Sequence, residues 1–388
     1  MLILRNLILV SLFLIGAIGI NQSHAMIGID LEKLKPLTQI DYMPRSDFED
    51  QTKVVEDIPY DDRFLSFQVR LPADFKMSEG DIKLDIDRQL GKRVLGVVTK
   101  YISAPRNYIR SLFTIEALEL TYEISARNWF INYVVSNGLT LEQVGDGDDN
   151  GVEAIYIEIK GDQTYIVRVR AIKNGPRMII ARYYLPQEFY DEQRVMQAQV
   201  IRSFKLNNKE DVGIEELEVY GFLDQSYFKY PQSWNIKVPY IRSINRMQAV
   251  IYNDLRQNRL DGQIAIYLTN KSVETTREAE IEYYRDLSQV EDYVLGNFIE
   301  EIELKYHPDI NYGITEVYAY NSQQSNLLEY ELWFTFLEGK DYFYVLTLLT
   351  PSREDDFYIW SRNSEAFKIV AQEIRRSGEG LDYYEFIQ

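Results

Sequence analysis

The residues of this chain that most resemble a binding site form the acidic run Asp146–Gly151. Asp146, Asp148 and Asn150 place oxygen ligands at the first, third and fifth positions of a calcium loop, and glycine takes the sixth. The twelfth position, which requires a bidentate glutamate, is Ile157. The same composition is typical of a polar turn that leads into a strand. The sequence therefore leaves two interpretations open, a plain turn and an incomplete calcium loop.

The chain has few of the other residues that catalysis requires. It contains no cysteine and two histidines, His24 and His307. Triads that need a histidine base together with a serine or cysteine nucleophile are not expected, and neither are zinc sites of histidine and cysteine. His307 lies in KYHPDI and is expected to be a loop residue near a turn. No phosphate-binding glycine motif is present. We therefore expect no catalytic residue, no cofactor and no enzymatic activity, with a carboxylate-based hydrolase as the least favoured hypothesis.

The first 25 residues have the organisation of a cleavable export signal. Arg5 is followed by the uncharged run Leu7–Ile20, and Ser23-His24-Ala25 supplies small residues at the cleavage positions. The apolar run is shorter than the roughly 20 residues that span a membrane. We therefore predict cleavage after Ala25 and no transmembrane segment in the mature chain.

The composition of the chain limits which cellular compartment and which classes of partner are expected. The formal net charge is −18, which disfavours binding to nucleic acid or to anionic membrane surfaces. An exported chain without cysteine is unlike the disulfide-stapled proteins of eukaryotic secretion. These features together predict a protein of the bacterial periplasm.

Two stretches of the chain follow the same plan. Each opens with an aromatic strand that ends at a proline, Pro72 in FLSFQVRLPADF and Pro231 in QSYFKYPQSWNI. Two short strand-like runs and a helix-like stretch follow, over 121–135 in the first copy and 276–295 in the second. Three strands joined by glycine-containing turns then end at Pro186 and Pro351, and an amphipathic helix closes each copy.

This repeat predicts an α+β fold, with two tandem α/β/α sandwich domains that each have a mainly antiparallel sheet and flanking helices. The expected segments along the chain are a signal peptide 1–25, an acidic leader 26–60, a first domain 61–206, a linker 207–216, a second domain 217–378 and an aromatic tail 379–388. The leader carries no sustained period, and we expect it to be either disordered or a docking arm. In the tail, Tyr383, Tyr384 and Phe386 are candidate binding residues, which either add a strand to a partner or fold back on their own domain.

The second copy resembles the PsbP-like family in three places. These are the entry strand YFKYPQSWNI, the late strand YFYVLTLLTPS and the closing helix EDDFYIWSRNSEAFKIVAQEIR. The first copy has Phe75 where the second has Trp234, and both residues are expected to fill the core. The resemblance implies an extracytoplasmic sandwich that binds larger assemblies without catalysing a reaction.

The sequence therefore favours a non-catalytic periplasmic scaffold or accessory subunit of an envelope assembly, such as a secretion or conjugation apparatus. The expected partners are envelope proteins. The alternative hypothesis is a periplasmic protein that binds a small ligand or metal ion in a cleft between the two domains.

Overall fold

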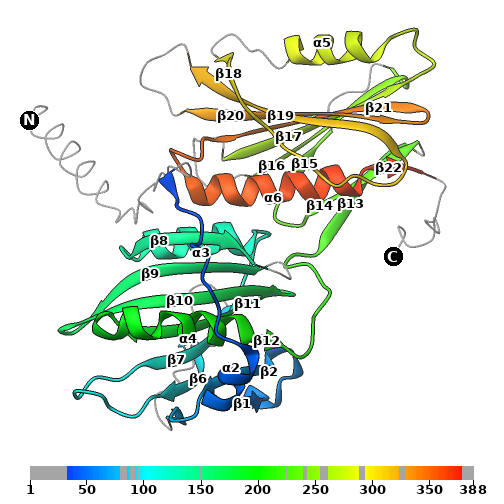
Figure 1. Ribbon diagram of the computed structural model, residues 1–388. Coiled ribbons are helices and arrows are strands. Elements are labelled where there is room, and N and C mark those ends of the chain that lie inside the picture. The colour runs from blue at the N-terminus through cyan, green and yellow to red at the C-terminus, as the bar shows by residue number, and fades with distance from the viewer. Residues whose placement is uncertain are drawn as a thin grey trace, which may run out of the picture.

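A computed structural model describes most of the chain, with gaps, from residue 33 to residue 377 (Figure 1). The described ranges are 33–78, 85–87, 92–94, 96–147, 151–223, 225–238, 243–253, 261–287, 293–322 and 329–377. Only the backbone is described at 85–87, 92–94, 293–294 and 321–322. No helix among these residues is long and apolar enough to cross a membrane.

The first unit begins inside the leader and ends at the linker. Its helices are α2 (Arg45–Gln51), α3 (Ala126–Ser136) and α4 (Tyr190–Ser203), with 3-10 turns η2 (Pro59–Asp61), η3 (Arg63–Leu65) and η4 (Gln187–Phe189). Its strands are β1 (Thr52–Asp57), β2 (Phe67–Pro72), β3 (Lys76–Met77), β4 (Asp85–Asp87), β5 (Lys92–Val94), β6 (Gly96–Ile102), β7 (Leu112–Glu119), β8 (Thr140–Asp146), β9 (Gly151–Lys160), β10 (Gln163–Asn174), β11 (Arg177–Pro186) and β12 (Lys205–Leu206).

The second unit repeats this order. Its helices are α5 (Arg277–Leu287) and α6 (Phe357–Glu373). Its strands are β13 (Leu217–Phe222), β14 (Ser226–Pro231), β15 (Asn235–Lys237), β16 (Arg246–Asn253), β17 (Gly262–Asn270), β18 (Tyr293–Glu301), β19 (Ile310–Ser322), β20 (Tyr330–Gly339), β21 (Tyr342–Pro351) and β22 (Arg375–Arg376).

The two main sheets have the same strand order. The first runs β3-β6-β7-β11-β10-β9-β8 and the second β15-β16-β17-β21-β20-β19-β18, with every neighbouring pair antiparallel. Each unit adds a small three-stranded sheet, β1-β2-β12 or β13-β14-β22. The expected fold class, two tandem α+β units, is confirmed.

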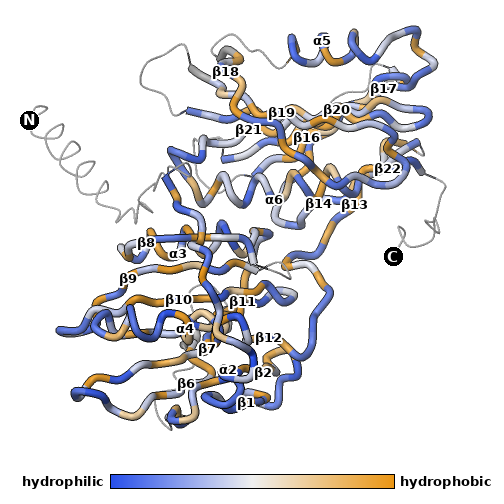
Figure 2. The backbone as a smooth tube through the Cα atoms, in the orientation of Figure 1, coloured by the Kyte–Doolittle hydropathy of each residue, from blue (hydrophilic) through white to orange (hydrophobic). Residues whose placement is uncertain are grey.

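Alternation along the strands explains why each sheet is covered on both faces. In β11, Ile179 and Ala181 pack toward α4 and β2, whereas Met178 and Ile180 pack toward α3. Successive strand residues point to opposite faces, so a strand that is apolar throughout needs a cover on each side. Hydrophobic positions accordingly follow the strands of both sheets (Figure 2).

The two entry strands end in the same turn. The amide of Phe75 donates to the carbonyl of Pro72, and the amide of Trp234 donates to the carbonyl of Pro231, both at 3.0 Å. Phe75 and Trp234 are buried, as expected from the sequence. The prolines end their strands, and the aromatic residue three positions later closes the core.

Three sequence-based expectations need correction. The helix expected over 276–295 ends at Leu287, and β18 begins at Tyr293, because this second segment pairs with β19 as the edge of the sheet. The leader is not irregular throughout, since α2 and β1 form within it and Phe48 is buried in the core of the first unit. The closing helix, expected over 354–375, spans Phe357–Glu373, because residues 375–376 pair with β14.

Candidate interaction surface

The two units meet where α3 of the first packs against α6 of the second. One cluster of buried residues extends from Phe130 and Tyr156 in the first unit to Trp333 and Phe367 in the second. In Figure 1 both helices lie between the two main sheets. The units therefore share an apolar core, and its burial holds them in one arrangement.

Arg362 of α6 lies inside this contact and is 5% exposed. Its guanidinium carbon is 3.5 Å from the ring centroid of Tyr122, which precedes α3, and 5.6 Å from that of Tyr358. Burial lowers the pKa of Arg362, because the charged guanidinium loses its water. The aromatic faces compensate in part for this lost hydration.

Two glutamates fasten the linker to the first unit. Glu123 accepts from the amides of Ile214 at 2.6 Å and Glu215 at 3.1 Å, and its second oxygen lies 3.5 Å from the Lys173 Nζ. The Glu215 carboxylate accepts from the Glu123 amide at 3.0 Å and from the Ser233 amide in the second unit at 3.0 Å. These bonds join backbone groups of both units through one short segment.

The leader covers the outer edge of the first sheet. The amide of Val144 in β8 donates to the Lys35 carbonyl at 2.9 Å. Thr38 and Gln143 form two further bonds of 2.9 Å, one from the Thr38 amide to Oε1 and one from Nε2 to the Thr38 hydroxyl. The face of the first unit made by α3 and β8 is thus covered by α6 on one part and by residues 34–38 on another.

The corresponding face of the second unit is made by α5 and β18. Both helices begin with a hydroxyl cap, since Ser125 accepts from the Asn128 amide and Thr276 from the Ala279 amide. The edge strands β8 and β18 each have a register shift at an equivalent position. In both strands the shift follows a residue that is paired with a tyrosine of the neighbouring strand. That residue is Leu141 in β8, which packs against the shared core, and Phe298 in β18, which is 55% exposed.

The exposed side of α5 carries two parallel rows. Glu278, Glu282 and Asp286 form an acidic row, and Ala279, Tyr283 and Leu287 form an apolar row beside it, all of them exposed. Residues four apart lie on one helix face, so each row is continuous along the helix. We call these six residues together with Phe298 the outer face of the second unit.

The cations of this region are directed to other carboxylates. Arg246 pairs with Glu280 at 2.5 Å, and Arg285 pairs with Glu316 of β19. Arg277 and Lys271 both pair with Glu338 of β20, at 2.5 and 2.7 Å. Among the described residues, no lysine, arginine or histidine side chain lies within ion-pair distance of the acidic row. The outer face therefore presents net negative charge to its surroundings.

Phe298 belongs to the same face as the helix. It lies opposite Tyr318 in the register, with ring centroids 5.8 Å apart, and opposed residues of an antiparallel pair share a face. The Tyr318 hydroxyl donates to Glu316 at 2.8 Å, the carboxylate that also binds Arg285 of α5. Burial, and then the bond to Glu316, raise the pKa of Tyr318 to about 12. An unbroken line of contacts thus leads from β18 to α5.

Glu338 fixes the first turn of α5 and gives a testable dependence on pH. Burial raises its pKa, but its hydrogen bonds and charge interactions with Lys271 and Arg277 outweigh burial, so the pKa is below its usual value. A lowered carboxyl pKa stabilises the fold above the unfolded pKa of about 4.3, and the contribution disappears as the pH falls through the folded pKa. We expect Glu338→Gln to be less stable than wild type at pH 7 and equally stable well below pH 4. Urea denaturation at both pH values measures this difference, and an equal deficit at low pH would contradict the account.

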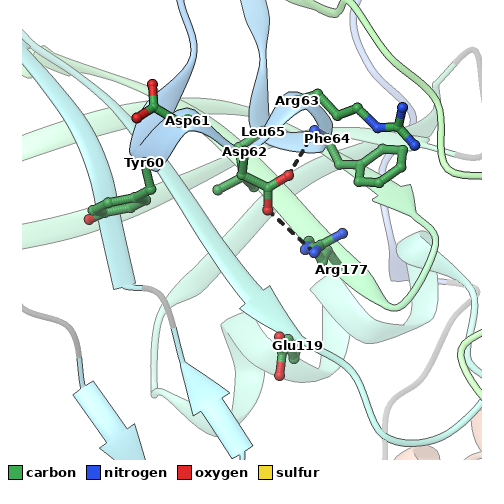
Figure 3. A pocket seen from close by; sticks show the side chains of 8 residues that line it. All are labelled: Tyr60, Asp61, Asp62, Arg63, Phe64, Leu65, Glu119 and Arg177. Atoms are coloured by element: carbon green, nitrogen blue, oxygen red, sulfur yellow. Dashed lines mark hydrogen bonds and ion pairs between the residues drawn. The ribbon is translucent and has the colours of Figure 1, made fainter.

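A separate cavity of about 510 Å³ lies in the first unit (Figure 3). Tyr60, Asp61, Asp62, Arg63, Phe64, Leu65, Glu119 and Arg177 line it. Asp62 accepts from the Phe64 amide at 2.9 Å and pairs with Arg177 at 3.3 Å, and Arg177 also pairs with Glu210 of the linker. Arg177, one of the two arginines that line the cavity, is therefore already matched by two carboxylates.

Of the site residues predicted from the sequence, the structure describes only Asp146. The Asp146 carboxylate is 3.5 Å from Arg127, and the Gly147 amide donates to the Gly151 carbonyl, as in a turn. Asp148 and Asn150 lie outside the described residues, as do Tyr383, Tyr384 and Phe386 of the tail. Within the part of the chain that is described, no group of three or more acidic or histidine side chains could hold a metal ion.

His307 lies in a loop next to a turn, as the sequence predicts. Its Nδ1 is 3.3 Å from the Asp309 amide, and its Nε2 is 3.3 Å from Arg375. The outer face, by contrast, was not predicted from the sequence. Its one sequence signal was the four-residue spacing of Glu278, Glu282 and Asp286.

Comparison with known proteins gives structural likeness alone. No family model matches the chain, and no curated protein does either. The solved structure of PsbP from the cyanobacterium Synechocystis sp. PCC 6803 matches 44% of this chain and 98% of its own, at 16% identity and a TM-score of 0.30. The PsbP-like resemblance is therefore weak and confined to the fold.

Two further solved structures are similar at the same low level. The Ran-binding protein Mog1p of Saccharomyces cerevisiae matches 42% of this chain and 95% of its own, at 10% identity and a TM-score of 0.30. The immunity protein TplEi of the T6SS from Pseudomonas aeruginosa matches 80% of this chain and 94% of its own, at 9% identity and a TM-score of 0.22. These values carry no argument about function.

Proposed function

We propose that this protein is a non-catalytic binding protein of the bacterial periplasm. It acts as an accessory or structural subunit of an envelope assembly, such as a secretion or conjugation apparatus. The signal-like first 25 residues and the acidic, cysteine-free composition support the compartment.

The observation that carries the proposal is the unequal cover of two equivalent faces. In the first unit, the face made by α3 and β8 is covered by α6 and by residues 34–38. In the second unit, Tyr283, Leu287 and Phe298 of the equivalent face are 49%, 49% and 55% exposed. Repeated modules bury such faces against a neighbour, and a face left open at the end of an array needs either a cap or a partner. We assign this face to a protein partner.

A small-ligand protein is the second candidate, and the cavity of the first unit favours it. Its volume of about 510 Å³ falls within the range of ligand pockets. The pairing of Arg177 with Asp62 and Glu210 leaves this cation committed to the protein itself. We therefore rank this candidate below the protein-binding one.

The proposal is tested on envelope extracts of the native bacterium by size-exclusion chromatography. We expect the wild-type protein to elute in a complex larger than the monomer. The variant with Leu287→Ser and Phe298→Ser should elute as a monomer, because central apolar anchors contribute about 1–2 kcal/mol each to binding.

The matched control carries Tyr108→Ser and Ile159→Ser, two exposed apolar residues of the first unit. It should retain the complex. A wild-type protein that elutes alone, or a control that loses the complex equally, would rule out the assignment.

A further inference from the structure

We infer that the partner of the outer face is a cationic amphipathic helix, with a row of lysine or arginine beside a row of apolar residues. This inference rests on the proposed function and adds the chemistry of the partner. It is carried by the two rows of α5, by the ion pairs around them and by the contact between the units.

The helix dipole favours Glu278 in the first turn of α5, but it does not favour the rest of the acidic row. Glu278, Glu282 and Asp286 are spaced four apart, and like charges at this spacing oppose helix formation. Asp286 lies in the last turn, where the helix dipole disfavours negative charge. The repulsion within the row and the unfavourable place of Asp286 are explained when a positive partner lies against the row.

The neighbouring cations form their ion pairs with carboxylates outside the row. Arg246, Arg277 and Arg285 are held by Glu280, Glu338 and Glu316 respectively. Their positive charges are compensated by these carboxylates, which leaves the three outward carboxylates of α5 to an incoming group. A partner with the opposite charge gains both in rate of association and in specificity.

The apolar row fixes the shape of the partner. Ala279, Tyr283 and Leu287 form a stripe along the axis of α5, and Phe298 extends the apolar surface onto the edge strand. A helix with residues at the same four-residue spacing can match such a stripe over its length. The contact between the units is a precedent for such helix packing. There α6 packs on α3 and places Arg362 against the ring of Tyr122.

The test uses the full chain and two synthetic 20-residue helical probes that share one leucine row. The adjacent row is lysine in the first probe and glutamate in the second. We expect wild type to bind the lysine probe about tenfold more tightly by fluorescence anisotropy, since three exposed charge pairs contribute about 0.5 kcal/mol each. The variant with Glu278→Lys, Glu282→Lys and Asp286→Lys should prefer the glutamate probe by a similar factor.

The control variant reverses three exposed acids of the first unit, Asp50→Lys, Asp162→Lys and Glu188→Lys. It has the same net charge as the α5 variant and should keep the wild-type preference. The inference is overturned if wild type binds both probes equally, or if the control changes the preference as much as the α5 variant. If the large complex is retained in extracts but both probes bind equally, the inference of a cationic helix is wrong and the proposed function is unaffected.

Discussion

Replacement of Glu331 by alanine is expected to lower the free energy of unfolding of the second unit by about 3–5 kcal/mol. Glu331 is buried in β20 and accepts from the Arg353 Nε at 2.7 Å and from its second guanidinium nitrogen at 2.9 Å. It also accepts from the indole nitrogens of Trp360 at 2.7 Å and Trp333 at 3.3 Å. The substitution leaves two indole groups and two guanidinium nitrogens without this acceptor, while the third nitrogen of Arg353 stays paired with Glu300 at 2.7 Å.

Urea denaturation followed by tryptophan fluorescence measures this loss. The control is Glu354→Ala, at an exposed position next to Arg353, and it should stay within about 0.5 kcal/mol of wild type. The double variant with Glu331→Leu and Arg353→Met should recover part of the loss, because an apolar pair needs no compensating charge. A Glu331→Ala protein as stable as the control would show that this cluster does not hold the unit together.

Replacement of Glu123 by alanine is expected to loosen the two units from one another, at a cost of about 3 kcal/mol. The buried carboxylate binds two linker amides, those of Ile214 and Glu215, and it is the nearest partner of Lys173. Without it, these groups lose their acceptor at the place where the chain passes from one unit to the next.

Small-angle X-ray scattering tests this expectation, because separation of the units increases the radius of gyration. The exposed Glu188→Ala serves as the control and should scatter as wild type does. A Glu123→Ala protein with unchanged scattering and unchanged stability would mean that the shared core alone fixes the arrangement.

The repeat and most strands could be predicted because their alternation is strong. Apolar and aromatic residues fill most positions of β11 and β21, and a glycine, Gly175 or Gly339, marks the turn before each strand. Pro72 and Pro231 end equivalent strands, so the two copies could be aligned from their prolines. These signals are local and do not depend on how the units pack.

The helix and strand around residue 290 could not be separated in the same way. Ile281, Tyr284, Leu287 and Val294 continue a helical spacing, and Ile281 and Tyr284 pack in the core cluster beneath α5. Leu287 is exposed, and the segment from Tyr293 pairs with β19. Aromatic and branched residues suit either element, so the sheet edge decided the outcome.

The candidate surface depends on tertiary information that the sequence lacks. Phe130 of α3 and Tyr284 of α5 each pack on the sheet of their own unit. Nothing in the local sequence shows which of these two helices is covered by the other unit. That distinction arises from the contact between α3 and α6. The acidic row of α5 was visible in the sequence, but its significance depends on Glu280, Glu316 and Glu338 holding the nearby cations.

The most direct test of the outer face is site-specific photo-crosslinking in the native organism. A photoreactive residue is placed at Tyr283 of the full-length protein, and in a second strain at Tyr108, the fully exposed tyrosine of the first unit. We predict one discrete protein adduct from position 283 and none from position 108. An adduct of equal yield from both positions, or none from position 283, would contradict the claim that the outer face of the second unit is the binding surface.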